Sequence, residues 1–480
     1  MAMKKTLFLW LIPIQMLILT GCNAFLEKPQ PVDSIPIDEA FNSIEDVTTA
    51  LRGAYRKMER LEFQLIMYPA FQSDNFNYIA GSTWDRSIVN IPFSASGGRN
   101  GAFWSDAYQL INQANLVLQT LEAEPEFGEE AERRQIEGEA LFLRALGHFE
   151  MARLFARPYG PNAAQDLGVP LMLTATTSSS EITFPARASV QEVYDQVIAD
   201  LQRATELLPE PFLAGRVHRY AAHAYLARVA FQKRDYALAA QQAALAMEGD
   251  FALTASPLDF FRNEGSAEEI WVIVHTPQER NGMEGRTGAG WMVLQEDLLA
   301  EGFPSIITPE QAAEAQQNQW QVVDLRRSTL TDTAGTDVVS TKYENPNWED
   351  DIPILRLADQ LLIRAEALAH TSGVNAESIA LLNDVRRRAL RVVDANGDPV
   401  AGAAELVEFE ASDFTEATEL IEAIIRERRV ELLFEGNRFH ELMRLQRPVR
   451  GYAHDADELR WPIPQREMDA NPNLVQNPGY

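Results

Sequence analysis

The chain has almost no cysteine, since Cys22 is the only one among its 480 residues. A single thiol cannot build a disulfide framework, and it cannot supply the paired thiolates that many structural zinc sites use. The seven histidines are scattered singly, with no His-Glu-x-x-His pair among them. We therefore expect no disulfide, no metal site and no other cofactor.

Positive charge is also scarce, because 42 basic residues face 70 acidic ones and give a formal net charge of −28. Such a chain repels phosphate-rich partners, so neither nucleic acid nor an anionic lipid headgroup is an expected partner. After the leader described below, no apolar run is long enough to span a membrane. With 46% hydrophobic residues, the rest of the chain has enough apolar side chains for a large core.

Signature motifs of common enzyme classes are missing as well. The glycine-rich run at 285–290 has neither the spacing of a dinucleotide fingerprint nor the Lys-Ser/Thr of a phosphate loop, which favours a plain loop. Asp394, Asn396 and Asp398 lack the later glutamate of a calcium loop, so we predict a tight turn between two short strands. Carboxylate pairs for glycoside hydrolysis stay open, because 70 acidic residues offer too many candidates.

What the chain does have is a distinctive N-terminus. Lys4 and Lys5 precede an apolar run at 7–19 that is too short for a membrane helix and is typical of a secretory leader. The leader ends in Leu-Thr-Gly followed by Cys22, a pattern that resembles a bacterial lipobox. We expect residues 1–21 to be removed and the Cys22 thiol to carry lipid, which anchors the chain to a membrane.

A tether and a large body follow this anchor. Prolines at 29, 31 and 36 keep the segment 22–36 extended. The alternative, an ordinary secreted protein, is less favoured because the only cysteine stands where lipid attachment needs it. We expect residues 37–480 to form a single domain, with an N-terminal helical part at about 37–248 and a C-terminal part at about 249–480.

Helical periodicity dominates this body and predicts a mostly α fold. The clearest unit is 216–248, where two alanine-rich helices around a short polar turn resemble a tetratricopeptide-type hairpin. Ser189 and Glu192 form a capping box that begins another helix, expected to run to residue 208. The other helical predictions are the segments near 38–58, 107–121, 130–156, 354–389 and 415–445.

Irregular stretches separate these helices. The segment 72–103 is rich in Asn, Gly and Ser, 170–185 is an extended Thr/Ser-rich connector, and 250–347 is a long insertion with a strand near 270–274. The tail 460–480 carries four prolines and is predicted to contain no helix. Its Trp461 and Ile463 are expected to press onto the body.

Short motifs occur in a fixed order along nearly the whole mature chain. They include Phe-Leu-Glu-Lys-Pro at 25–29, Ile-Asn-Gln-Ala-Asn at 111–115, Glu-Ala-Leu-Phe-Leu-Arg-Ala at 139–145, Arg-Leu-Ala-Asp at 356–359, Leu-Asn-Asp-Val-Arg at 382–386, Arg-Glu-Arg-Arg-Val-Glu-Leu at 426–432 and Gln-Asn-Pro-Gly-Tyr at 476–480. Together and in this order they resemble the SusD/RagB family, the glycan-binding surface lipoproteins of Bacteroidetes-type bacteria.

The resemblance implies a fold and a role. The fold is the SusD-like arrangement of four tetratricopeptide-type helical hairpins with long loop-rich insertions and few short strands. The role is non-catalytic binding of oligosaccharides at the exterior of the outer membrane, followed by delivery to a SusC-like TonB-dependent transporter. The arginine-rich helix near 426–438 is expected to serve packing, with Arg428, Arg429, Glu431 and Arg438 joining it to its neighbours.

Binding residues vary within such a family, so the candidates come from chemistry. Sugar rings stack on aromatic planes, and their hydroxyl groups need amide, carboxylate or guanidinium partners. Both kinds of side chain occur in one early segment and in the later insertion, which gives the candidates Asn75, Tyr78, Trp84, Arg86, Trp291, Trp320 and Trp348. For Trp104, at a helix start, core packing is the preferred interpretation. An α-helical surface glycosidase and a helical-repeat adaptor for protein partners stay as alternatives.

Overall fold

The computed structural model describes residues 40–79, 88–210, 215–262, 265–277, 291–303, 307–345, 347 and 349–480. The predicted leader, the predicted lipid attachment at Cys22 and the predicted tether therefore lie outside the described residues. Within those ranges, no helix is both long enough and apolar enough to cross a bilayer.

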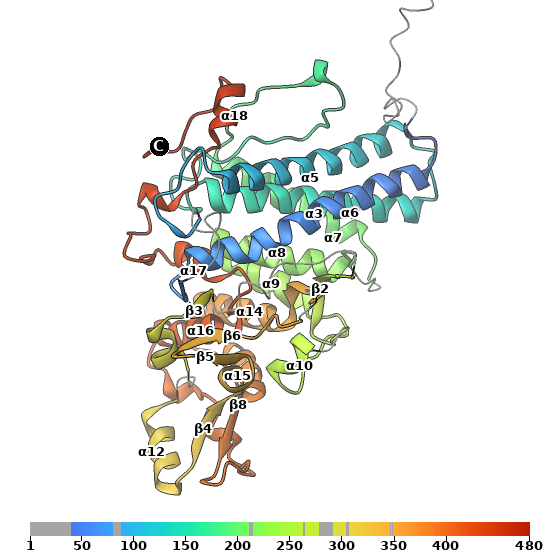
Figure 1. Cartoon of the computed structure of the whole chain (residues 1–480). Coiled ribbons are helices and arrows are strands. Elements are labelled where there is room, and N and C mark those ends of the chain that lie inside the picture. The colour runs from blue at the N-terminus through green and yellow to red at the C-terminus, as the bar shows by residue number, and fades with distance from the viewer. Residues whose placement is uncertain are drawn as a thin grey trace, which may run out of the picture.

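Long helices packed side by side form the N-terminal part (Figure 1). They are α3 (Ile44–Gln72), α5 (Gly98–Ala123), α6 (Glu130–Phe155) and α7 (Val190–Leu207). Each contacts the next in this order, and apolar side chains between them are fully buried. The predicted capping box is confirmed, because the Ser189 hydroxyl accepts from the Glu192 backbone N–H at 3.1 Å while the Glu192 carboxylate accepts from Ser189.

Helix α5 begins at Gly98 rather than near residue 107, so the early irregular stretch is shorter than predicted. The reason is the burial of two aromatic side chains in its first turns, Phe103 and Trp104, which outweighs the poor helix propensity of the Gly and Asn residues around them. Trp104 packs edge-on against Phe155 of α6, with ring centroids 5.1 Å apart. Its predicted packing role is confirmed.

The three predicted hairpins are confirmed. They are α8 (Arg219–Lys233) with α9 (Tyr236–Ala246), α14 (Leu357–Ser372) with α15 (Ala376–Ala389), and α16 (Ala417–Glu431) with α17 (Arg438–Arg444). Alanines from α8 and α9 are buried against α14, which allows these helices to approach closely. The hairpins are thus contiguous in space although long insertions separate them in sequence (Figure 1).

The described strands are short and pair only in twos. The antiparallel pairs are β1 (Phe76–Tyr78) with β3 (Met292–Leu294), β2 (Glu269–Ile273) with β7 (Ile352–Arg356), β4 (Gln321–Asp324) with β8 (Leu390–Val393), and β5 (Thr331–Ala334) with β6 (Asp337–Ser340). Short helices α10 (Pro257–Arg262), α12 (Pro309–Asn318) and α13 (Leu325–Thr329) lie between them. The predicted strand near 270–274 is confirmed as β2.

The C-terminal tail departs from its prediction in one element. A short helix, α18 (Gln465–Ala470), interrupts the extended chain, so the expectation of a helix-free tail is wrong. Pro464 is the residue just before this helix, where no helical hydrogen bond requires a backbone N–H from it. The next proline comes only after the helix has ended. The expected packing of Trp461 and Ile463 is confirmed, because both are fully buried.

The acidic segment after β8 is the predicted tight turn. The Asp394 carboxylate accepts from the backbone N–H groups of Asn396 and Asp398, at 2.8 and 3.0 Å. Gly397 supplies the positive φ of +85° that the turn requires, and Val393 then pairs with Pro399. Both backbone groups donate to the Oδ1 atom of Asp394, and its Oδ2 atom accepts from the Asn396 side-chain amide at 3.3 Å.

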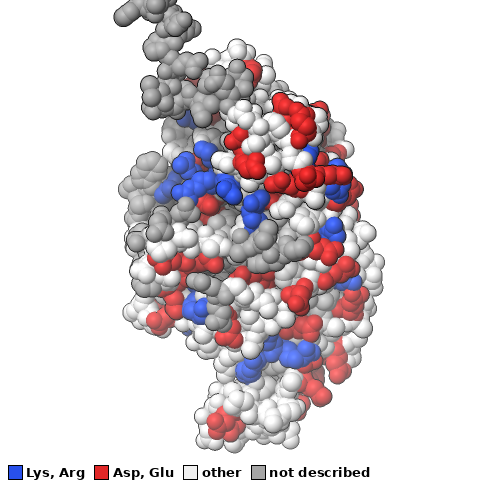
Figure 2. All heavy atoms as spheres, turned by 90° about the vertical axis from the view of Figure 1, so that its right-hand side faces the viewer, with Lys and Arg blue, Asp and Glu red and all other residues white. Residues whose placement is uncertain are grey.

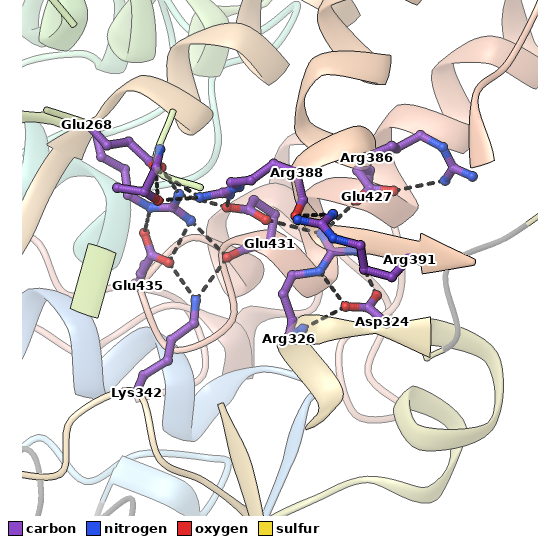
Figure 3. A network of polar contacts seen from close by, with 12 residues as sticks. Glu268, Asp324, Arg326, Lys342, Arg386, Arg388, Arg391, Glu427, Glu431 and Glu435 are labelled. Atoms are coloured by element: carbon purple, nitrogen blue, oxygen red, sulfur yellow. Dashed lines mark hydrogen bonds and ion pairs between the residues drawn. The ribbon is translucent and has the colours of Figure 1, made fainter. Parts of the chain in front are cut away.

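Charged side chains fill the centre of the C-terminal part (Figure 3). The Glu431 carboxylate receives hydrogen bonds from Arg326, Arg356 and Arg388. Glu268, Glu435, Asp324 and Glu427 are further acceptors for these guanidinium groups and for two more cations, Lys342 and Arg386. We call these ten residues the buried ion network; none of their side chains is more than 5% exposed.

The predicted structural role of the arginine-rich helix is confirmed by its contacts. Arg428 of α16 bridges Asp359 of α14 and Glu441 of α17, with N···O separations of 3.2 and 2.9 Å. Arg438 and Glu431 likewise bond to other elements of the body. These charges therefore join α16 to its neighbours.

Candidate functional site

Two segments that the sequence assigns to ligand binding are joined by one small sheet. Strands β1 and β3 pair antiparallel, although they lie more than 200 residues apart in the sequence. Beyond the paired residues, the backbone N–H of Ile79 donates to the carbonyl oxygen of Trp291 at 2.9 Å. The last described residue before Trp84 and the first described residue after the segment 278–290 are therefore hydrogen-bonded neighbours. We call the described residues 75–79 and 291–295 the β1–β3 edge.

Charged contacts hold this edge on α16 and α17. Arg438 donates two hydrogen bonds to the Asp74 carboxylate, both 2.8 Å long. Arg429 donates to the Asn75 side-chain oxygen at 2.8 Å and to Asp297 at 2.9 Å. Two-pronged arginine–carboxylate bonds fix orientation as well as distance, so the start of β1 is held rigidly.

The apolar side of β1 is fixed by a ring contact. Phe76 lies against Phe434, with ring centroids 3.8 Å apart and ring planes inclined by 31°. Phe434 belongs to the turn between α16 and α17, where Gly436 has a φ of +74°. A Cβ atom on Gly436 would lie 2.4 Å from the Leu65 carbonyl oxygen of α3, so only glycine fits there. The edge thus rests on packed helices.

Amide groups form the outer side of the edge. Asn77 is exposed, and its side chain donates to the Gln295 side-chain oxygen at 3.1 Å. The Gln295 amide donates back to Asn77 at 2.6 Å. Ile79 is 50% exposed beside them. Paired amides beside an apolar side chain suit a ligand that has both hydroxyl groups and C–H faces.

A buried ion pair marks the other end of the segment 278–290. His275, shortly after β2, contacts Glu62 of α3 at 2.8 Å, and both side chains are 4% exposed. Its backbone N–H donates to Asp351. Burial alone would lower the pKa of His275, but the Glu62 contact raises it above its usual value, while burial raises the pKa of Glu62. The described chain before residue 278 is therefore anchored to α3.

The structure brings together some of the predicted ligand residues and not others. Tyr78 and Trp291 are both half-buried at the β1–β3 edge, but Tyr78 lies opposite Met292, so the two aromatic side chains are on opposite faces of the ladder. Tyr78 packs edge-on against Phe71, with ring centroids 5.5 Å apart, whereas Trp291 is on the face of Asn77 and Ile79. Asn75 lies beside them but is only 1% exposed, so it anchors the edge and does not face a ligand. Trp320 lies elsewhere, before β4, where it packs on the cluster around Leu390. The others, Trp84, Arg86 and Trp348, lie outside the described residues.

Gln295 is absent from the sequence-based candidates, and Asn77 enters there only as a member of the early irregular segment. The signal was available in the alternation of buried Phe76, exposed Asn77 and half-buried Tyr78, which is the period of a strand. The segment was interpreted as an irregular loop, and its partner strand lies too far along the chain for the pairing to be inferred.

The carboxylate of Asp74, next to the edge, is adapted to staying ionised. Burial alone would raise its pKa, but the hydrogen bonds and charge of Arg438, with the charge of Arg429, lower the pKa below its usual value. A general acid needs the opposite shift. Among the described residues, no group of three or more His, Cys, Asp or Glu side chains is arranged to hold a metal ion.

The visible surface agrees with the acidic composition. In Figure 2 acidic side chains are spread over most of the face, whereas basic ones gather in separate patches. A surface of this kind favours uncharged ligands over polyanions.

Family models match most of the chain. A SusD-like model described as "Starch-binding associating with outer membrane" matches residues 24–231, and a model described as "SusD family" matches residues 309–459. SusD-like protein P2 of Formosa agariphila is 25% identical, over 97% of this chain and 98% of that protein. SusD-like protein P38 of the same organism is also 25% identical, over 99% of each chain.

Solved structures show the same fold. A SusD superfamily protein from Bacteroides thetaiotaomicron superposes with a TM-score of 0.75 at 23% identity, covering 91% of this chain and 100% of the other. A SusD-like carbohydrate binding protein from Bacteroides vulgatus superposes with a TM-score of 0.69 at 19% identity, covering 91% and 98%. The predicted mostly helical fold with few short strands is confirmed.

Proposed function

The chain belongs to the SusD/RagB family, and from this premise we propose that it binds oligosaccharides at the exterior of a bacterial outer membrane. The single observation that carries the proposal is the β1–β3 ladder, which sets Asn77, Ile79 and Trp291 on one edge of the body. The family description as starch-binding supports a carbohydrate as the ligand class.

Binding without cleavage is the activity that fits this edge. Asp74 is held ionised by two arginines, and the neighbouring polar groups are amides, which orient hydroxyl groups and transfer no proton at neutral pH. The glycosidase alternative needs one carboxyl group with a raised pKa facing a second across a cleft. The bound oligosaccharide is then delivered to a SusC-like TonB-dependent transporter, which lies beneath this protein in the outer membrane.

Anchoring completes the proposal. The Cys22 thiol carries the lipid, and residues 22–36 are the tether that lets the body move above the transporter. Tethering raises the effective concentration of bound glycan at the mouth of the barrel. The family description as outer-membrane associated supports this location.

Affinity measurements on matched tryptophan variants test the binding proposal. Trp84→Ala and Trp291→Ala are expected to weaken oligosaccharide binding roughly ten- to hundredfold, the scale of one lost stacking platform. Trp320→Ala is the control, because this side chain packs on a different sheet. Equal losses in all three variants would contradict the assignment to the β1–β3 edge, and shortened oligosaccharide after long incubation would support the glycosidase.

Membrane fractionation tests the anchor. Cys22→Ala is expected to release the protein from the membrane fraction and to abolish incorporation of labelled fatty acid. Retention of the variant would contradict lipidation.

The transporter partnership predicts co-purification of a large outer-membrane β-barrel in mild detergent. Recovery of the protein alone from an extract that contains this barrel would contradict the partnership.

A further inference from the structure

A second hollow lies far from the β1–β3 edge, and nothing above assigns it a role. Its volume is about 580 Å³, and its walls are α5, the connector 170–185 and α18. In Figure 1, α18 lies above α5, whereas β3 lies below α3. The volume falls within the roughly 300–1,000 Å³ of ordinary ligand sites. We call this hollow the connector groove.

Side chains of the helical layer fasten one wall of the groove. Asn112 forms two hydrogen bonds with the backbone of Thr176, at 2.7 and 3.2 Å. The Tyr108 hydroxyl donates to the Pro170 carbonyl oxygen at 2.8 Å, and the Met172 backbone N–H donates to His148 at 3.2 Å. These hydrogen bonds fix the connector to α5 and α6, so this wall of the groove is in place before any ligand binds.

The C-terminal tail fastens the far end of the same wall. Asn471 donates to the Pro185 carbonyl oxygen at 2.9 Å, and Asn473 donates to that of Phe184 at 2.6 Å. These bonds hold the Phe184 backbone while its side chain is 47% exposed. Ile182, also on the wall, is 53% exposed. An exposed aromatic ring on a fixed backbone is the kind of platform on which the C–H face of a sugar ring stacks.

The helix wall supplies directed polar groups. The Lys57 ammonium donates to the Gln109 side-chain oxygen at 2.7 Å, and the Gln109 amide donates to the Ser105 hydroxyl at 2.9 Å. Among the described residues no hydrogen bond uses the Ser105 hydroxyl proton, which leaves it as a donor. Gln113 donates to the Ala50 carbonyl oxygen and keeps its own oxygen as an acceptor. Sugar hydroxyl groups both donate and accept, so they need this mixture.

We propose that the connector groove is a second carbohydrate-binding site, in which a short stretch of neutral glycan lies across Phe184. The ligand class rests on the proposed function, whereas the place is independent of it. The charged side chains of the groove are Lys57, Arg466 and Glu467, with a net charge of +1. Arg466 and Glu467 pair with each other, which leaves one cation, too little positive charge to select a polyanion over an uncharged sugar chain.

Hydrogen–deuterium exchange on the full chain carrying Cys22→Ala tests the proposal. The probes are malto-, cello-, xylo- and manno-oligosaccharides of six to eight units. We expect at least one of them to slow exchange in residues 104–113 and 170–185. Phe184→Ala is expected to remove this protection and to weaken the corresponding binding step about tenfold. Leu167→Ala is the matched control, since Leu167 is also exposed but does not line the groove.

The outcomes separate this inference from the proposed function. Protection of residues 75–79 and 291–295 alone overturns the second site and leaves the first intact. Protection of the connector groove alone supports the second site and overturns the first, and protection of neither overturns both. If Phe184→Ala instead weakens co-purification with the transporter and leaves glycan-induced protection unchanged, the groove binds protein and the inference is wrong.

Discussion

The two halves of the molecule both have apolar cores but differ in the charge that they bury. The helical layer holds separate ion pairs such as Arg144 with Asp200, whereas the C-terminal part holds one connected network. In the helical layer of α3, α5, α6 and α7, apolar side chains such as Leu146 and Phe149 are fully buried against one another. In the C-terminal part, the buried ion network gathers ten charged side chains, Glu431 among them, into one cluster (Figure 3). Apolar packing is tolerant of direction, whereas buried ions need a partner at a fixed place.

This difference indicates which interactions fix the arrangement of elements in each half. Many apolar sequences fill a helical layer, but a buried carboxylate with three guanidinium neighbours fixes which elements meet. The network joins strand β7, helix α15, helix α16 and the segment before β2. Because β1 rests on α16 and its following turn, the network also fixes the base of the candidate site.

The largest expected effect comes from removing the central charge of the network. Glu431→Gln keeps the shape of the side chain but leaves buried cations without their counter-charge, and we expect a loss of about 3–5 kcal/mol in the free energy of unfolding. Urea denaturation measures it. Glu422→Gln on the same helix is the control, because Glu422 is partly exposed and its ion pair should contribute less than about 1 kcal/mol. Equal losses would contradict the proposed role of the network.

A cavity in the apolar layer should have a somewhat smaller effect. Leu146→Ala removes a fully buried side chain, and we expect a loss of about 2–4 kcal/mol, because neighbouring helices close the cavity only in part. The comparison is Leu167→Ala, whose side chain is 40% exposed and should change stability by less than about 1 kcal/mol. A loss for Leu146→Ala exceeding that of Glu431→Gln would reverse the contrast between the two halves.

Mild acid should next destabilise the molecule through buried histidines of both halves, which include His148 in the helical layer and His440 in α17, because burial lowers the pKa of each. Burial, with the nearby charge of Arg144, lowers the pKa of His148 in the helical layer to about 3. The unfolded chain takes up a proton near pH 6.5 and the folded chain does not, so stability falls as pH falls from 6.5 towards 3. The slope from this residue is at most about 1.4 kcal/mol per pH unit. His148→Asn should flatten the curve of unfolding free energy against pH.

Glu431 should contribute nothing to that slope above about pH 4.5. Burial alone would raise its pKa, but Arg388, Arg356, Arg326 and Lys342 lower the pKa well below its usual value. Its stabilisation is complete above the unfolded pKa near 4.3 and is lost only as pH falls through the lower folded value. A difference between Glu431→Gln and wild type that already changes between pH 6.5 and 5 would contradict this assignment.

The smallest expected effect is a helix cap. Ser189→Ala removes the hydroxyl that accepts from Glu192 at the start of α7, and we expect a loss of about 1 kcal/mol. Thermal unfolding followed by circular dichroism measures it. Ser189→Asp is the control, because aspartate keeps an acceptor at this position and should preserve most of the stability.

Local signals predicted much of this architecture. The capping box at Ser189 and the alanine-rich hairpin of α8 and α9 depend on residues close in sequence, so their patterns are visible without a structure. The start of α5 was missed because burial of Phe103 and Trp104 decides it, and burial depends on distant partners. Helix ends are thus predictable where residues close in sequence determine them.

The candidate site was harder, because it depends on pairing across the whole chain. Asn75 and Tyr78 are close in sequence, yet Asn75 points into the body through its contact with Arg429, more than 350 residues later. Trp291 and Trp320 both looked suitable for one platform, but they precede strands of different sheets. Composition proposes candidate residue types, and only the register of β1 on β3 decides which of them are neighbours.

The β1–β3 ladder has a consequence for how this protein diversifies. Its hydrogen bonds join backbone atoms, so they do not depend on which side chains follow residue 79 or precede residue 291. New sequences inserted between these points and the body inherit the same attachment, as loops do on an antibody scaffold. Changes in the sequences after residue 79 and before residue 291 can therefore alter ligand preference while the ladder and the helical body stay unchanged.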